Sequence, residues 1–192
     1  MRNGLFDLTI GSRMIFRSLL DAMANPGHII TLPQIDIEPP VENKYPLLLL
    51  MTLLDHEVNF CVLNHDTRIT EYLRSNTQSK ESTIEDSDFI LVYEGTSHGL
   101  IRKARIGSLE YPDESATVIY EIDMTGEGGV LLELSGPGIV DKRRIRINGI
   151  KQTEIEDVLS IKDYPLGVDV ILSNRVGMIA CIPRSTSVNV IS

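Results

Sequence analysis

The run Phe89-Ile90-Leu91-Val92-Tyr93 most restricts how this chain can fold. Successive apolar residues cannot alternate between core and solvent, so a strand made of them is buried on both faces. Such a strand lies inside a sheet and needs a layer of other elements on each side. The run therefore predicts a layered α/β domain in which residues 89–93 form a central strand.

Apolar residues at helical spacing predict one of the covering helices near the start of the chain. The helix is capped by Ser12 and ends at Asn25-Pro26-Gly27. Its inward stripe, at positions i, i+3, i+4 and i+7, consists of Phe16, Leu19, Leu20 and Met23.

The remaining pattern mixes helices, strands and turns. Further helices are predicted at residues 45–54, after Asp66 or Thr67 and at 153–159, and further strands at 28–32, 58–63 and 142–147. Residues 116–122 and 130–134 are predicted to form a hairpin, with Gly126-Glu127-Gly128-Gly129 as its turn. Together these elements predict a single domain over residues 1–192, a three-layer α/β/α sandwich around a mixed sheet.

Charge and composition exclude several classes of partner. The chain of 192 residues carries a net charge of −9, which disfavours both nucleic acid and anionic membrane surfaces. The longest apolar run, residues 46–54, is about half the length of a membrane-spanning helix.

Cys61 and Cys181 lie in apolar runs, which predicts buried, reduced thiols. We expect a soluble cytoplasmic protein.

The C-terminal segment predicts a second hairpin with a polar pair. Residues 168–172 and 178–182 are apolar strands, but Asp169 interrupts the first of them. A carboxylate in such a strand must be paired or hydrogen-bonded. We expect Asp169 to have a structural role, either in an ion pair with Arg184 or as an acceptor for backbone amides.

Gly136-Pro137-Gly138 and the basic stretch that follows it have two interpretations. The glycines allow close backbone approach, and exposed amides in such a turn can hold an oxyanion. Alternation places Arg144 and Arg146 on one face of the strand at 142–147. The stretch is then either a solvated edge strand or a surface that docks a partner or binds phosphate.

Arg17 is a further candidate because it borders the apolar stripe of the first helix. Its guanidinium can bind a carboxylate or phosphate of a ligand, or form an internal ion pair. The four histidines lack metal-ligand spacing, and the sequence shows neither a Walker-type phosphate loop nor a nucleophile elbow. We therefore expect no metal site and no cofactor, and we name no catalytic residue.

Three blocks of sequence resemble one protein family. They are residues 16–27 (FRSLLDAMANPG), residues 134–139 (LSGPGI), and the C-terminal pieces PLGVD at 165–169 and IPRST at 182–186. Their order and spacing are similar to those of the PhnH family, the H subunit of the bacterial carbon–phosphorus lyase system that degrades phosphonates.

The resemblance implies a fold like that of the pyridoxal-phosphate-dependent transferases, without the cofactor. It implies a homodimer that also joins the G, I and J subunits of a core complex. That complex assists formation of ribose 1-alkylphosphonate 5-triphosphate from ATP and an alkyl phosphonate, a transferase reaction in which the H subunit is auxiliary.

One alternative comes from the residues themselves. In it, the protein is a stand-alone enzyme or binding protein for a small phosphorylated metabolite. Its anion site would be formed by Arg17, Gly136, Gly138 and Arg184, and this hypothesis requires those groups to converge in one cleft of a single protomer or of a dimer.

Overall fold

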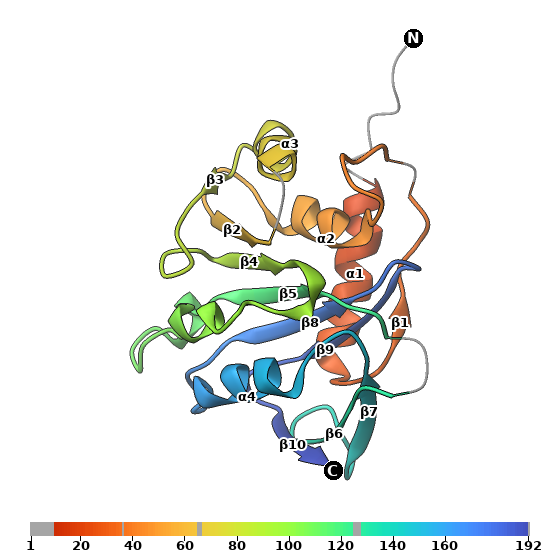
Figure 1. Ribbon diagram of the computed structural model, residues 1–192, viewed down its shortest axis with the longest axis vertical. Coiled ribbons are helices and arrows are strands. Elements are labelled where there is room, and N and C mark those ends of the chain that lie inside the picture. The colour runs from red at the N-terminus through yellow and green to blue at the C-terminus, as the bar shows by residue number, and fades with distance from the viewer. Residues whose placement is uncertain (1–9, 36, 65–66, 125–127, 192) are drawn as a thin grey trace.

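Two sheets form the centre of the computed structural model, which describes residues 10–35, 37–64, 67–124 and 128–191. The larger sheet has seven strands in the order β1-β9-β8-β5-β4-β2-β3, and the smaller has three in the order β10-β6-β7 (Figure 1). The large sheet consists of β1 (Ile30–Thr31), β2 (Asn59–Leu63), β3 (Lys80–Glu81), β4 (Phe89–Val92), β5 (Thr117–Glu121), β8 (Asp169–Ser173) and β9 (Met178–Ile182).

The central strands are parallel and buried on both faces. Strand β4 lies between β2 and β5, and β8 follows β5 in the same direction. Ile90, Leu91 and Val92 are inaccessible to solvent, which confirms the prediction from the apolar run. Strand β9 pairs antiparallel with β8, and β1 pairs antiparallel with β9 at the edge of the sheet. The predicted C-terminal hairpin is the β8–β9 pair.

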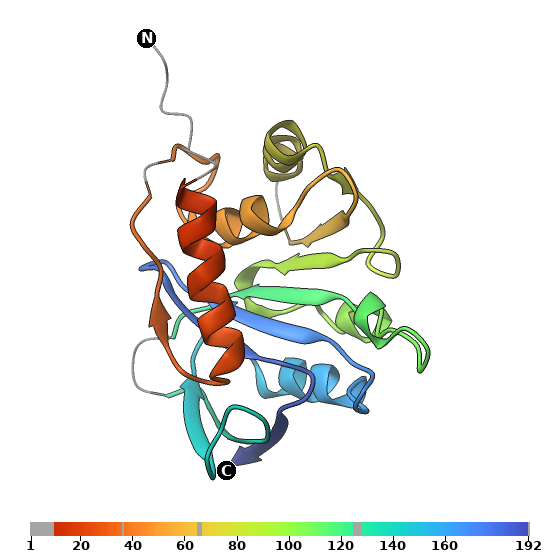
Figure 2. The same cartoon turned by 180° about the vertical axis from the view of Figure 1, so that it is seen from behind.

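Three helices cover one face of the large sheet: α1 (Ile10–Ala24), α2 (Tyr45–Leu53) and α3 (Thr67–Thr77). Helix α2 packs against both α1 and α3, so the four leucines Leu47 to Leu50 are all buried. Figure 2 shows α1 lying across this face. The predicted buried helix at 45–54 is confirmed.

The inward face of α1 differs from the prediction. Its buried residues are Gly11, Ile15, Leu19 and Ala22, whereas Phe16 and Leu20 are 46% and 54% exposed. Both sets have helical spacing, so periodicity alone does not distinguish them. The buried stripe contains the small residues Gly11 and Ala22, whereas the predicted stripe consists of large apolar residues.

The opposite face of the large sheet is covered partly by helix and partly by the small sheet. The helical part consists of η2 (Leu100–Lys103) and α4 (Gln152–Ser160), and the small sheet of β6 (Val130–Ser135), β7 (Arg143–Ile147) and β10 (Ser187–Ile191). The predicted α/β/α sandwich is therefore corrected: the third layer is mixed.

The predicted hairpin of residues 116–122 and 130–134 is wrong. Strand β5 pairs with β4 and β8 in the large sheet, whereas β6 pairs with β7 and β10 in the small one. Gly126 and Glu127 lie outside the described residues, but the strands on either side belong to different sheets. The glycine-rich segment thus links two sheets. Its glycine-rich composition is compatible both with a hairpin turn and with a link between two sheets.

A buried carboxylate joins the elements of the third layer. Glu154 of α4 is 2% exposed. It accepts hydrogen bonds from the Tyr120 hydroxyl at 2.7 Å and from the Ser97 amide at 2.9 Å. Burial raises the pKa of Tyr120 well above its ordinary value, and the negative charge of Glu154 adds to the effect. The phenol therefore stays protonated and connects α4 to β5.

The basic strand β7 forms one edge of the small sheet, as the alternation predicts. Ile145 and Ile147 are buried, and Arg144 and Arg146 are exposed. Lys142 and Arg144 both contact Glu133 on the neighbouring strand, at 2.5 and 3.2 Å. Hydrogen bonds from Lys142 and then Arg144 hold the pKa of Glu133 below its usual value. These cations are thus engaged within the sheet.

No helix in the described part of the chain combines the length and the apolar character needed to span a bilayer.

The two cysteines give a chemical test of this packing. Both thiols are free and buried, and burial raises the pKa of Cys61 to about 11 and that of Cys181 still further. Only the thiolate reacts with iodoacetamide, so we predict no labelling of the native protein at neutral pH and labelling of both cysteines in denaturant. Mass spectrometry checks this, and rapid native labelling of either thiol would contradict the described core.

Candidate functional site

Polar side chains stand side by side where three parallel strands end. The register pairs Val92 with Tyr120 and Glu121 with Ser173, so Tyr93, Glu121 and Ser173 form a row across β4, β5 and β8. Side chains two residues apart in a strand point to the same face of the sheet. The row therefore points toward the face covered by α1, α2 and α3, as Leu91 and Ile119 do two residues earlier. In open α/β sheets, ligands bind outside the carboxyl ends of the strands.

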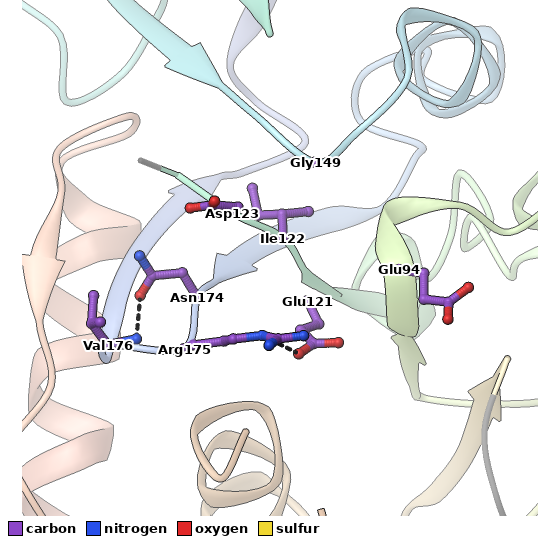
Figure 3. A pocket seen from close by; sticks show the side chains of 8 residues that line it. All are labelled: Glu94, Glu121, Ile122, Asp123, Gly149, Asn174, Arg175 and Val176. Atoms are coloured by element: carbon purple, nitrogen blue, oxygen red, sulfur yellow. Dashed lines mark hydrogen bonds and ion pairs between the residues drawn. The ribbon is translucent and has the colours of Figure 1, made fainter. Parts of the chain in front are cut away.

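Glu121, at the centre of the row, is held by the start of α2. The Asn43 side-chain amide donates to Glu121 Oε1 at 2.9 Å. The Asn43 Oδ1 in turn accepts the Tyr45 amide at 3.2 Å, which fixes the asparagine at the first turn of the helix. Arg175 Nε lies 3.9 Å from Glu121 Oε1, and Figure 3 shows the two side chains aligned.

The two hydroxyls beside Glu121 have no hydrogen-bond partner within the described residues. They are the Tyr93 OH and the Ser173 Oγ, and both atoms are buried. Burial raises the pKa of Tyr93 far above its ordinary value, and the charge of Glu121 raises it further. Tyr93 therefore remains a hydrogen-bond donor. Buried hydroxyls without partners are rare and often mark a place where water or a ligand binds.

A cavity of about 510 Å³ opens beside this row. Its lining carries three carboxylates and one guanidinium, together with the Asn174 amide (Figure 3). Glu94 has a φ of 61°, a conformation that non-glycine residues seldom adopt outside functional or strained sites. The polar lining residues are Glu94, Glu121, Asp123, Asn174 and Arg175. We call this cavity and the row beside it the carboxyl-edge pocket.

The chemistry of the carboxyl-edge pocket favours ligand groups that donate hydrogen bonds or carry positive charge. Its negative lining repels phosphate. The side chains that the structure describes contain no group of three histidines, cysteines or carboxylates placed to hold a metal ion.

The glycines predicted to bind an anion lie at a junction of three chain segments. A Cβ atom at Gly138 would be 2.3 Å from the Ala24 carbonyl oxygen, and one at Gly136 would be 3.1 Å from that of Ser185. Arg143 donates to the Pro26 oxygen at 2.8 Å across the same junction. The three sequence blocks therefore meet in space. Because carbonyl oxygens face these glycines, close backbone packing explains them better than an oxyanion cradle.

The Asp169 side chain binds the backbone amide of Arg184 and not its guanidinium. Asp169 Oδ1 accepts the Arg184 amide at 2.8 Å, one of the two roles expected for this aspartate. The Arg184 guanidinium does not pair with Asp169; its NH1 donates to the Pro112 carbonyl and the Ser115 hydroxyl. The carboxylate thus fixes the turn after β9, and the arginine side chain extends to the segment before β5.

Arg17 lies on the exposed side of α1, on the helix-covered face of the large sheet. Arg184 lines a different cleft, together with side chains that pack in the opposite layer. Within one protomer, the two arginines therefore lie in different places, so the stand-alone alternative requires a dimer to bring them into one cleft.

Sequence reasoning missed the carboxyl-edge pocket, although a signal for it was present. Polar residues stand at the end of each of three apolar runs: Glu94 follows the run 89–93, Glu121 ends β5, and Ser173 ends β8 and is followed by Asn174. Only the knowledge that these strands are parallel neighbours brings the residues together.

Comparison with known proteins identifies the family. The family described as "Bacterial phosphonate metabolism protein (PhnH)" matches residues 3–189. The chain belongs to the PhnH family. It is 31% identical over 179 residues to a protein of Stutzerimonas stutzeri named as the C-P lyase subunit protein HtxG, covering 91% of this chain and 84% of that protein.

A second relative comes from Rhizobium meliloti (strain 1021). It is named alpha-D-ribose 1-methylphosphonate 5-triphosphate synthase subunit PhnH. Identity is 26% over 184 residues, which cover 94% of this chain and 91% of that protein. Both relatives thus match over most of their length.

A pair of glycine variants tests the block junction. Gly138 and Gly128 both have positive φ, but only Gly138 is crowded, since a Cβ at Gly128 meets nothing within 4 Å. We predict that Gly138→Ala lowers the free energy of unfolding by about 3 kcal/mol and Gly128→Ala by about 1 kcal/mol. Chemical denaturation measures both, and equal effects would contradict the close packing.

A pair of serine variants tests the unpartnered hydroxyl. Ser173 and Ser87 are both fully buried, but Ser87 Oγ donates to the Thr83 carbonyl at 2.7 Å. We predict that Ser87→Ala lowers the free energy of unfolding by about 1 kcal/mol, whereas Ser173→Ala leaves it unchanged or raises it. An equal loss in both variants would show that the Ser173 hydroxyl has a partner in the folded protein.

Proposed function

We propose that the protein is a subunit of the carbon–phosphorus lyase system that breaks down organic phosphonates. In this role it assists formation of ribose 1-alkylphosphonate 5-triphosphate from ATP and an alkyl phosphonate. The observation that carries the proposal is the family match over residues 3–189, together with relatives named as subunits of a C-P lyase and of a synthase.

We further propose an auxiliary role in that transferase reaction. Both cysteine thiols are buried, with pKa values raised by burial, so neither is an activated nucleophile. The carboxyl-edge pocket supplies acceptors and two hydroxyls, but its negative charge does not suit a triphosphate. A subunit that supports a catalytic partner fits these properties better than a complete enzyme.

A fold related to the pyridoxal-phosphate-dependent transferases, without that cofactor, is also part of the proposal. A mixed sheet with parallel central strands is compatible with it. The lysines do not fit the cofactor: the two half-buried ones, Lys44 and Lys162, donate to the carbonyls of Ile35 and Pro183, and the other four are exposed. A Schiff-base lysine needs an amine that is free to form a covalent bond, whereas both half-buried amines are bound to backbone carbonyls.

The proposed partners are the G, I and J subunits in the cytoplasm, with a homodimer when the protein is alone. The exposed side of α1 suits a contact with another subunit of the complex. Ile10, Met14 and Leu20 are 61%, 49% and 54% exposed there, more than a solvated helix usually shows. These apolar side chains flank Arg13 and Arg17, which are also exposed.

The charges on α1 favour a different chain over a second copy. Two copies related by a two-fold axis close to Arg13 and Arg17 would bring the same arginines together, because a two-fold interface uses the same patch twice. A partner with an apolar surface and an acidic border avoids that repulsion. We therefore assign this side of α1 to a hetero-subunit contact.

Co-expression with the G, I and J subunits tests the proposal. We expect the protein to co-purify with them, and we expect Leu20→Glu to weaken the association at least about ten-fold, because a buried charge in an interface is costly. Val140→Glu is the matched control, since Val140 is fully exposed on a loop of the small sheet. A well-folded protein that never co-purifies would contradict the subunit role, and equal effects of both variants would contradict the α1 contact.

A further inference from the structure

A second cleft lies at the other end of the parallel strands, beside the start of β8. It has a volume of about 350 Å³ and collects two cations and four hydroxyls. One carboxylate, Asp163, also lines it. The six groups are Lys162, Tyr164, Arg184, Ser185, Thr186 and Ser187. We call it the amino-edge cleft.

Lys162 is positioned by the hydrogen bonds of its ammonium group and lies between two cavities. It also lines the small apolar cavity beneath α4, together with Leu159 and Val188. Its Nζ donates to the Pro183 carbonyl at 3.3 Å and to that of Thr186. An ammonium has three protons, so one N–H remains for a ligand. The lysine thus holds the turn 183–186 and keeps its charge at the cleft.

Arg184 is positioned from two sides. Its amide is bound by Asp169 Oδ1, and its NH1 is bound by Pro112 and Ser115. Within the described residues, its Nε and NH2 have no hydrogen-bond partner. The guanidinium is therefore oriented by the protein while part of its donor set remains available.

Thr186 supplies an independent sign that something binds here. The residue is fully buried and its Oγ1 has no partner among the described groups. A buried hydroxyl without a partner is costly unless water or a ligand completes its hydrogen bond. This hydroxyl belongs to a residue that lines the cationic cleft.

We propose that the amino-edge cleft binds the oxyanion of a tetrahedral phosphorus group, either a phosphate or a phosphonate. An oriented guanidinium, an ammonium and neighbouring hydroxyls are the donors that such groups prefer. The carboxyl-edge pocket, which is lined by three carboxylates, offers the opposite environment. The two sites thus separate anion binding from the binding of uncharged or cationic groups.

Protonation of Lys162 supports this assignment. Burial lowers the pKa of Lys162 to about 8, while the charge of Asp169 acts in the opposite direction. The lysine is then mostly charged at neutral pH, and an anion beside it favours the charged form further. Asp163, Asp169 and Arg184 are the other charged groups around it.

The source of the anion rests on the proposed function, whereas the cleft is defined by its own contacts. A phosphonate is the expected ligand if the subunit binds the substrate itself. A phosphate is expected if the subunit binds a phosphorylated product or a nucleotide. The binding test uses the isolated protein, so its failure is distinguishable from failure of co-purification.

The experiment is a titration of the full chain with inorganic phosphate and, separately, with methylphosphonate, at constant ionic strength. Backbone amide signals of residues 184–187 are followed in ¹H–¹⁵N correlation spectra. We expect saturable shifts in this segment with at least one of the two probes. The expected weakening is about ten-fold in Arg184→Gln, because a charge-assisted hydrogen bond is lost.

Three variants sharpen the test. Thr186→Val removes the unpartnered hydroxyl without changing the shape of the side chain, so we expect weaker binding with an unchanged or raised melting temperature. Asp163→Asn removes the carboxylate of the cleft and should strengthen binding. Arg146→Gln, on the exposed face of β7, removes one positive charge elsewhere and should leave binding unchanged.

Saturable shifts with this variant pattern support the site, and the stronger probe identifies the class of anion. Shifts that do not saturate would show nonspecific electrostatic binding and overturn the proposal. So would an equal loss of affinity in the Arg184→Gln and Arg146→Gln variants. No shift with millimolar concentrations of either probe would also overturn it.

Discussion

The burial of β4, β5 and β8 on both faces governs the rest of the structure. Helices α1 to α3 cover one face, and α4 with the small sheet covers the other, so ligands cannot reach the middle of the sheet. The two polar pockets therefore lie where the strands begin and where they end, whereas the buried carboxylate Glu154 is enclosed by its bonds to Tyr120 and Ser97. The carboxyl edge collects Glu94, Glu121 and Asp123, whereas the amino edge collects Lys162 and Arg184. The chain has a net charge of −9, so the cationic cleft is a local exception.

The junction of three sequence blocks connects these layers. Gly138 packs against the end of α1, Gly136 packs against the turn after β9, and Arg143 of β7 binds the Pro26 carbonyl. The junction thus fixes the small sheet against α1 and fixes the turn that carries Arg184. The blocks that resemble the PhnH family are then mainly architectural, and they shape the amino-edge cleft indirectly.

Local patterns in the sequence predicted much of the fold and little of the site. The run 89–93, helix α2 and the β8–β9 hairpin were predictable because each depends on neighbouring residues alone. The inward face of α1 was not, since two stripes have the same period and periodicity alone does not distinguish them. The assignment of β5 and β6 to different sheets depended on long-range pairing, and so did the row Tyr93, Glu121 and Ser173. Arg184 was found as a candidate, but Lys162 was missed because only the fold brings it to the same cleft.

Genetic complementation tests the central claim most directly, namely that this chain is a functional subunit of phosphonate breakdown. The host is a bacterium that lacks its own H-subunit gene but retains the other carbon–phosphorus lyase genes, grown with methylphosphonate as the sole phosphorus source. The account predicts that this chain restores growth on methylphosphonate. Soluble, well-folded protein that leaves the strain unable to use methylphosphonate, while growth on inorganic phosphate is normal, would contradict it.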